Sequence, residues 1–224
     1  MFSSDGKQLF IANRATGTHS ATGVSDSPLR MNRLNTPFDI TTDRVKTDVN
    51  SGCGDLDGAN PNDISGGDFG SDQLDNMHIA NDGRTFFFVS TVGVIGKFNL
   101  STPYDIGTMT YERKFSSGIA QIDSMHLSKD GKKLFLLNFT GNTPIVYTHT
   151  LPAPFDISST TLTHEVDLVD KGIILTTGSN DMGVDIEFTP EGNAMFIMIN
   201  NNHSKQNAAR HGIQGNQNYI YQFR

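Results

Sequence analysis

Ser128-Lys129-Asp130-Gly131-Lys132-Lys133-Leu134-Phe135 is the stretch of sequence that decides the fold. It places an acidic residue and a glycine at a fixed offset before an apolar run, and the chain carries this pattern four times. The acids of the four copies are Asp5, Asp82, Asp130 and Glu191, and the phenylalanines five residues later are Phe10, Phe87, Phe135 and Phe196. Repetition of one short unit along a chain indicates a repeat architecture.

The third copy divides into four short extended segments separated by residues typical of turns. We expect strands over residues 123–128, 133–138, 145–151 and 162–168. Between the first two strands, the Asp130-Gly131 pair predicts a hairpin turn in which Gly131 takes a positive φ. Each copy is therefore one small antiparallel sheet, too small to be stable alone.

A second turn motif, proline-aromatic-aspartate-isoleucine, also recurs. It is seen at residues 37–40 and 103–106, and again at 154–157. The second copy follows the same order, with its third strand expected over residues 94–100. The order of turns and strands is thus the same from copy to copy.

Stacking such sheets around an axis buries both faces of each sheet with short connections. We therefore predict an all-β protein, a β-propeller of about four four-stranded antiparallel blades, in preference to a β-sandwich or a parallel β-helix. The prediction treats residues 1–224 as a single domain, with blades at about 1–49, 73–118, 119–170 and 171–224 and a loop insertion at 50–72.

The pattern Ser-x-Asp-Gly-Lys-x-Leu-Phe, at residues 3–10 and 128–135, resembles the blades of WD40-like and YVTN-type propeller repeats. With residues 100–106 it is similar to repeats of virion or tail proteins of marine bacteriophages and of some bacterial surface proteins. The resemblance implies a scaffold and no reaction, because the matching positions are turn and core positions.

At the two ends of the sequence, the first and fourth copies are shorter than the others. Alignment on the acid-glycine pairs sets Met1 opposite His126, and alignment of the third strands sets Arg224 opposite Thr150. Three interpretations stay open: a four-bladed ring with one three-stranded blade, an incomplete gene product, or an open arc completed by oligomerisation. In the last case the unpaired terminal strands would form a homo-oligomer or bind another protein.

Composition excludes several classes of protein. The formal net charge of −7 argues against binding to nucleic acid, and no run of about 20 apolar residues exists for membrane insertion. Cys53 is the only cysteine, so no disulfide can form within the chain. No signal peptide is visible at residues 1–5, and the resemblance places the protein outside the cell or on a virion.

In a four-stranded antiparallel blade, the first and third turns lie on one face and the remaining connections on the other. The long segments 14–28, 50–72 and 201–218 all fall on the second face, which we expect to bind a protein or a surface glycan. Candidate partner-binding residues are His19, Asp26, Asn202, His203, Lys205, Arg210 and His211.

The segment from 50 to 72 concentrates oxygen-bearing side chains of the kind that calcium prefers. The candidate ligands are Asp55, Asp57, Asn60, Asp63 and Asp68, although their spacing is not that of an EF-hand. Calcium is the one candidate cofactor; a solvated acidic loop is the alternative interpretation.

No linear catalytic motif is present, so the sequence assigns no catalytic residue. The favoured hypothesis is a non-enzymatic binding or structural module of a virion, tail or cell-surface assembly. The alternative is an extracellular propeller hydrolase or lactonase with a metal site at the mouth of the channel.

Overall fold

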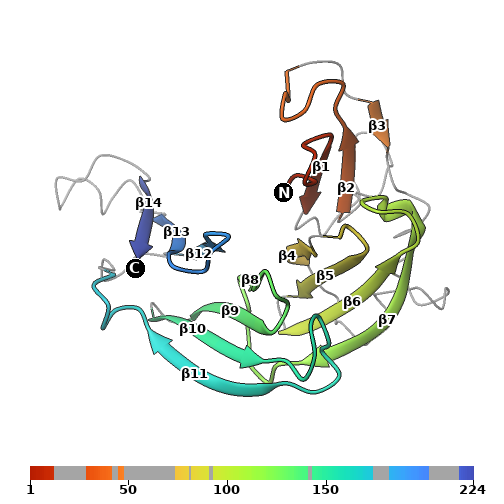
Figure 1. The fold of residues 1–224 in the computed structure, drawn as a ribbon. Helices are drawn as coiled ribbons and strands as arrows, with labels where there is room; N and C mark the ends of the chain where they lie inside the picture. The colour runs from red at the N-terminus through yellow and green to blue at the C-terminus, as the bar shows by residue number, and fades with distance from the viewer. Residues whose placement is uncertain are drawn as a thin grey trace, which may run out of the picture. The chain divides into compact units, whose positions relative to one another are not determined.

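The computed structural model describes nine ranges of the chain: residues 1–12, 29–41, 45–47, 74–80, 82–90, 93–140, 143–173, 182–201 and 217–224. Within these ranges the regular structure is fourteen β-strands and one short 3₁₀-helix. The strands form four antiparallel sheets (Figure 1), so the all-β prediction is confirmed. The chain divides into two compact units, residues 1–118 and 119–224.

The first unit contains two sheets. One has the order β1-β2-β3 and the other the order β4-β5-β6-β7, in each case the order of the sequence. Their bounds are β1 (Gln8–Ala12), β2 (Leu29–Arg33), β3 (Val45–Thr47), β4 (Leu74–Ile79), β5 (Thr85–Ser90), β6 (Val94–Leu100) and β7 (Met109–Ser116), with the 3₁₀-helix η1 at Ile106–Thr108.

The second unit repeats this construction. Its sheets have the orders β8-β9-β10-β11 and β12-β13-β14. Their bounds are β8 (Ser124–Leu127), β9 (Lys133–Thr140), β10 (Thr143–Thr150), β11 (Thr161–Asp167), β12 (Met182–Phe188), β13 (Met195–Asn201) and β14 (Gln217–Phe223). Successive up-and-down sheets of this kind are the blades of a β-propeller repeat protein.

The register of the sheets confirms the alignment of the four copies. His78 pairs with Phe87, His126 with Phe135, and Glu187 with Phe196, so each residue four before the acid faces the phenylalanine five after it. At the start of the chain the equivalent pair is joined by Phe10 N, which donates to Met1 O at 2.8 Å.

A separate apolar cluster fills each unit, because alternate strand residues point into it. In the first unit nine residues from both sheets are at most 7% exposed: Phe10, Met31, Ile79, Phe86, Phe88, Phe98, Leu100, Ile106 and Met109. The second unit has a cluster rich in isoleucine, leucine and valine that includes Leu137, Ile186 and Ile197. In both units neighbouring sheets share one core, as packed blades require.

Candidate functional site

The acid-glycine turns (residues 5–6, 82–83, 130–131 and 191–192) have one geometry in all four sheets. Their glycines have φ of +68 to +70°, a region that L-residues with side chains rarely adopt, so the prediction for Gly131 is confirmed. In the third sheet Asp130 Oδ1 accepts hydrogen bonds from Ser128 Oγ at 2.6 Å and Lys132 N at 3.1 Å. Both bonds hold the pKa of Asp130 below its usual value, and the bond from Ser128 has the larger effect.

The Pro-aromatic turns (residues 37–39, 103–105 and 154–156) pack directly on the acid-glycine turns. Their aromatic residues Phe38, Tyr104 and Phe155 have φ near +60°, which is uncommon for residues other than glycine. Each aromatic backbone N–H donates to the oxygen of the glycine in its own sheet, at 2.7–2.8 Å. The two turn types therefore lie together at one end of these sheets, as strand parity predicts.

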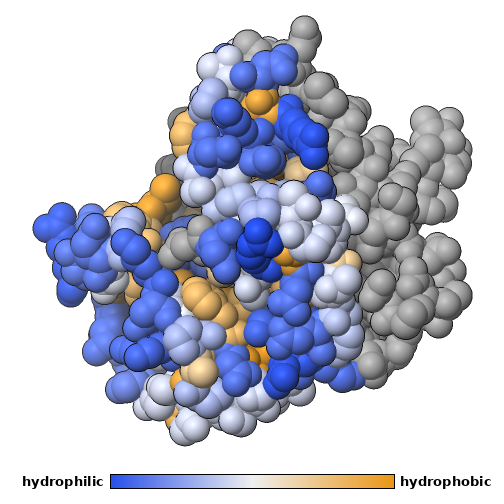
Figure 2. All heavy atoms as spheres, turned by 45° about the vertical axis from the view of Figure 1, so that its right-hand side comes forward, coloured by the Kyte–Doolittle hydropathy of each residue, from blue (hydrophilic) through white to orange (hydrophobic). Residues whose placement is uncertain are grey.

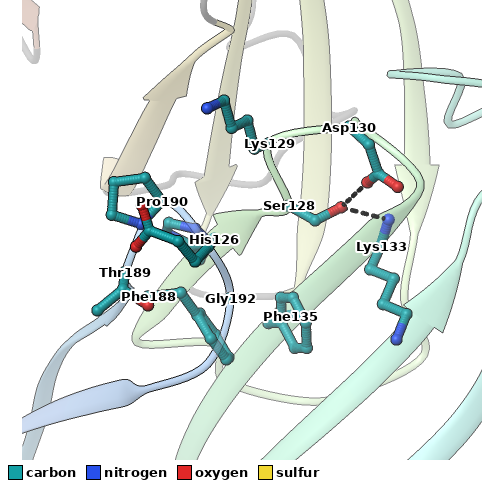
Figure 3. A pocket seen from close by; sticks show the side chains of 11 residues that line it. His126, Ser128, Lys129, Asp130, Lys133, Phe135, Phe188, Thr189, Pro190 and Gly192 are labelled. Atoms are coloured by element: carbon teal, nitrogen blue, oxygen red, sulfur yellow. Dashed lines mark hydrogen bonds between the residues drawn. The ribbon is translucent and has the colours of Figure 1, made fainter.

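A cleft in the second unit lies between two acid-glycine turns, one following β8 and one following β12 (Figure 3). It encloses about 370 Å³. Its lining comprises His126, Ser128, Lys129, Asp130, Lys133, Phe135, Phe188, Thr189, Pro190, Glu191 and Gly192. We call this cavity the turn cleft.

Three rings form the apolar part of the turn cleft. The centroids of Phe135 and Phe188 are 4.2 Å apart, and the His126 ring lies 5.2 Å from Phe188. Phe135 and Phe188 are only half-buried. Of the repeated phenylalanines, Phe10 and Phe87 are at most 1% exposed, whereas Phe135 and Phe196 are less buried, and the space beside Phe135 is open.

Hydrogen bonds between equivalent positions of β8 and β12 fix the floor of the turn cleft. His126 Nδ1 lies 2.8 Å from Glu187 Oε2, and Ser124 Oγ donates to Asp185 Oδ1 at 2.9 Å. The backbone N–H of Ile186 also reaches Ser124 Oγ, at 3.2 Å. These contacts hold the two strands, and with them the two aromatic rings, at a fixed separation.

The same position in the first unit is closed. Phe10 and Ile79 are the equivalents of Phe135 and Phe188, and they are 1% and 3% exposed. There Tyr104 Oη donates to Ser4 Oγ at 3.0 Å, and Arg33 lies 3.6 Å from Asp105. The Pro-aromatic turn of the second sheet thus covers the space between the two sheets of that unit.

The lining of the turn cleft offers both apolar and charged groups to a ligand. Aromatic faces accept apolar or aromatic groups, and Lys129 and Lys133 can pair with a carboxylate. Within the described ranges, no group of three or more histidine, cysteine, aspartate or glutamate side chains has a spacing suited to a metal ion. No helix in those ranges is long and apolar enough to span a membrane.

The residues that the sequence favoured as sites lie outside the described ranges. This holds for the calcium candidates Asp55, Asp57, Asn60, Asp63 and Asp68, and for the partner-binding candidates His19, Asp26, Asn202, His203, Lys205, Arg210 and His211. Sequence reasoning missed the turn cleft. The available signal was the exchange of histidine for glutamate at equivalent positions of neighbouring copies, His126 and Glu187.

Outside the turn cleft, exposed apolar side chains occur at separate positions of the described residues. Among the coloured residues of Figure 2, hydrophilic side chains predominate, with smaller apolar areas between them. The most exposed large apolar side chains, Ile220 and Phe38, are 71% and 60% exposed and come from different units. Single exposed apolar residues are normal on protein surfaces.

Similarity to known proteins is found among solved structures. No protein-family model and no curated protein matches the sequence. Among solved structures, the β-propeller domain of Swd1 from Myceliophthora thermophila matches 86% of this chain and 52% of its own, with 12% identity and a TM-score of 0.42. The class defined by the strand order and turns is the β-propeller repeat proteins.

Two further structures show the same level of similarity. A protein from Desulfotomaculum acetoxidans matches 92% of this chain and 51% of its own, with 11% identity and a TM-score of 0.46. A 6-phosphogluconolactonase-like protein of Bacteroides fragilis matches 70% and 40%, with 12% identity and a TM-score of 0.40. The chain spans about half the length of the first two structures, and similarity at this level does not extend to activity.

Proposed function

We propose that the protein is a non-catalytic binding module that receives a segment of a partner protein in the turn cleft. The observation that supports this proposal is the contrast between the two units. Equivalent residues are closed off in the first unit, at Phe10 and Ile79, and half-exposed in the second, at Phe135 and Phe188. Half-exposed rings in a cleft that is also lined by two lysines and two carboxylates, Asp130 and Glu191, are suited to an apolar side chain flanked by charged or polar ones.

The walls of the turn cleft are rigid, which favours the binding of a ligand there. Its walls are turns fixed by hydrogen bonds, such as Gly131 N to Ser128 O at 2.7 Å and Gly192 N to Thr189 O at 2.8 Å. Because the walls are already ordered, a ligand loses less binding free energy to ordering the protein.

The proposal extends to the setting predicted from the sequence. The acidic, Asn-, Thr-, Ser- and Gly-rich composition suits a virion, tail or cell-surface assembly outside the cell. The loops 14–28, 50–72 and 201–218 would provide a second contact surface there. Calcium would be held in the second of these loops, where the candidate ligands are Asp55, Asp57, Asn60, Asp63 and Asp68. Calorimetric titration with Ca²⁺ tests the calcium part, which fails without a saturable heat at about millimolar concentration.

The turn cleft is tested with peptides selected from a random phage-displayed library on the full chain and measured by fluorescence anisotropy. Phe188→Ser should weaken the selected peptides by roughly ten- to a hundredfold, since a buried aromatic contact contributes about 1.5–3 kcal/mol. The matched control is Leu162→Ser, which alters an apolar side chain of β11 that is 48% exposed. Because Phe188→Ser removes packing, Lys129→Glu serves as a second cleft variant at an exposed position.

Two results would contradict the proposal. One is a selection that enriches no peptide. The other is a set of peptides that bind Phe188→Ser and Lys129→Glu as tightly as the wild type, which would place the binding surface elsewhere.

A further inference from the structure

Three of the acid-glycine turns contain an Asp-Gly step: Asp5-Gly6, Asp82-Gly83 and Asp130-Gly131. Such a step can rearrange without an enzyme, because glycine has no side chain to keep its backbone nitrogen away from the aspartate carboxyl group. All three aspartates are exposed to solvent. The fourth turn carries Glu191, whose longer side chain would have to close a less favourable six-membered ring.

The backbone of the three turns is the same. Their glycines have φ of +69°, +69° and +68°, and each glycine N–H donates to the oxygen of the residue two before the aspartate, at 2.7–2.9 Å. Each aspartate Oδ1 accepts the backbone N–H two residues further on, at 2.8–3.1 Å. A difference in reactivity between the turns must therefore come from other contacts of the carboxylate.

A serine two residues before the aspartate supplies such a contact in two of the turns. Ser3 Oγ donates to Asp5 Oδ1 at 2.7 Å, and Ser128 Oγ donates to Asp130 Oδ1 at 2.6 Å. These bonds favour the charged carboxylate, and they are the largest cause of the lowered pKa of Asp5 and of Asp130. They also restrain the carboxyl group from turning toward the glycine nitrogen.

The second turn lacks this contact, because Ala80 stands at the position of the two serines. A methyl group donates no hydrogen bond. Among the described residues, the hydrogen bond to the Asp82 carboxylate is the one from Arg84 N, at 2.8 Å. The carboxyl group of Asp82 is therefore the least restrained of the three.

We propose that Asp82 is a site of spontaneous isomerisation to isoaspartate, and that it converts first among the three turns. In this reaction the backbone nitrogen of Gly83 attacks Cγ of the protonated Asp82 carboxyl group. The C–N bond forms, the C–O bond breaks, and one water leaves with the carboxyl OH and the amide proton. Water then opens the five-membered imide at the backbone carbonyl carbon of Asp82, which restores the lost atoms and leaves the backbone running through Cβ and Cγ.

Isomerisation would disturb a turn on which other parts of the first unit pack. Isoaspartate lengthens the backbone by one carbon immediately before Gly83, whose oxygen accepts Tyr104 N at 2.7 Å. The Tyr104 ring lies directly on Gly83, and its Oη donates to Ser4 Oγ at 3.0 Å. The modification should therefore loosen the packing of Tyr104 between the first and second sheets.

The test incubates the folded full chain in mildly acidic buffer and measures isoaspartate at each position by electron-transfer fragmentation of proteolytic peptides. Isoaspartate should accumulate at Asp82 about three- to tenfold faster than at Asp5 or Asp130, the factor that corresponds to one net hydrogen bond. Fragmentation is required because a further pair, Asp57-Gly58, lies outside the described ranges and in the same tryptic peptide as Asp82, residues 47–84.

Two reciprocal variants form a matched pair. Ala80→Ser supplies the missing hydroxyl group and should slow the conversion of Asp82 to the rate of Asp130. Ser128→Ala removes that group from the third turn and should speed the conversion of Asp130 by the same factor, with Asp82 unchanged. Thermal melts before the incubation establish that each variant is folded.

Three results would overturn the inference. One is conversion at Asp82 that is no faster than at Asp5 and Asp130. Another is an unchanged rate in whichever of the two variants folds. The third is a folded chain without isoaspartate at Asp82 at a time when a free peptide of residues 79–87 has converted, since the folded turn would then protect the site.

Discussion

Substitution of Gly131 by alanine should destabilise the protein far more than the same substitution at Gly192. The two glycines have φ of +68° and +70° and lie in equivalent turns of the same unit. The backbone cost of placing alanine in this region is therefore the same for both, about 1–2 kcal/mol.

The difference comes from the ring. A Cβ at position 131 would lie 2.7 Å from Cδ2 and Cε2 of Phe155 and 2.8 Å from Cγ, whereas no atom of the described residues lies within 4 Å of a Cβ at position 192. The ring cannot turn away freely, because Phe155 N is held to Gly131 O at 2.8 Å. Overpacking of this kind costs about 1–3 kcal/mol, which we expect as the extra loss for Gly131→Ala.

Urea unfolding of the two variants and the wild type, followed by circular dichroism at constant m-value, measures this difference. Gly172→Ala is the control for backbone strain alone, because Gly172 has a φ of +94° and no described atom lies within 4 Å of a Cβ built on it. Equal losses of unfolding free energy for Gly131→Ala and Gly192→Ala would refute the conclusion that turn-on-turn packing stabilises the third sheet.

Two further predictions concern titration and the cleft floor. Burial lowers the pKa of His149, which is 4% exposed, below the ordinary histidine value of 6.5. Below pH 6.5 the unfolded chain therefore binds a proton at this residue more readily than the folded protein does. The stability of the fold should accordingly decrease as the pH falls below 6.5. His149→Gln should flatten the dependence in thermal melts between about pH 5 and 7, and an unchanged profile would contradict the assignment. Glu187→Gln should cost at most about 1 kcal/mol of unfolding free energy, since Glu187 is 64% exposed, and a much larger loss would show that the pair with His126 is worth more than its exposure implies.

Features fixed by local sequence could be predicted. The third strand of the second copy was expected over residues 94–100, which are the bounds of β6, and Gly131 has the expected positive φ. Both follow from turn residues and apolar alternation within about ten positions. The first strand of the third copy starts one residue later than expected, at Ser124, and there Asp123 Oδ2 accepts the N–H of Phe139, 16 residues further along the chain.

Features that depend on distant segments could not be predicted. The Pro-aromatic motif was recognised as a turn. Its packing on the acid-glycine turn could not be predicted, because the two turns are brought together only when the strands between them pair. Likewise Phe10 and Phe135 hold the same position in the repeat, yet of the two only Phe10 is buried, because the Pro-aromatic turn of the second sheet covers the space beside it. A repeat pattern predicts equivalence, and differences between copies arise from their neighbours.

The stacking of one hairpin end upon another within a single sheet has a consequence for how the chain acquires its structure. Phe155 and Gly131 belong to the same sheet, as do Tyr104 and Gly83, so each such contact can form before any other sheet exists. Short-range contacts of this kind speed folding. During synthesis on the ribosome, each turn-on-turn contact can therefore form once its own repeat has emerged, and the sheet becomes stable when the next sheet packs against it.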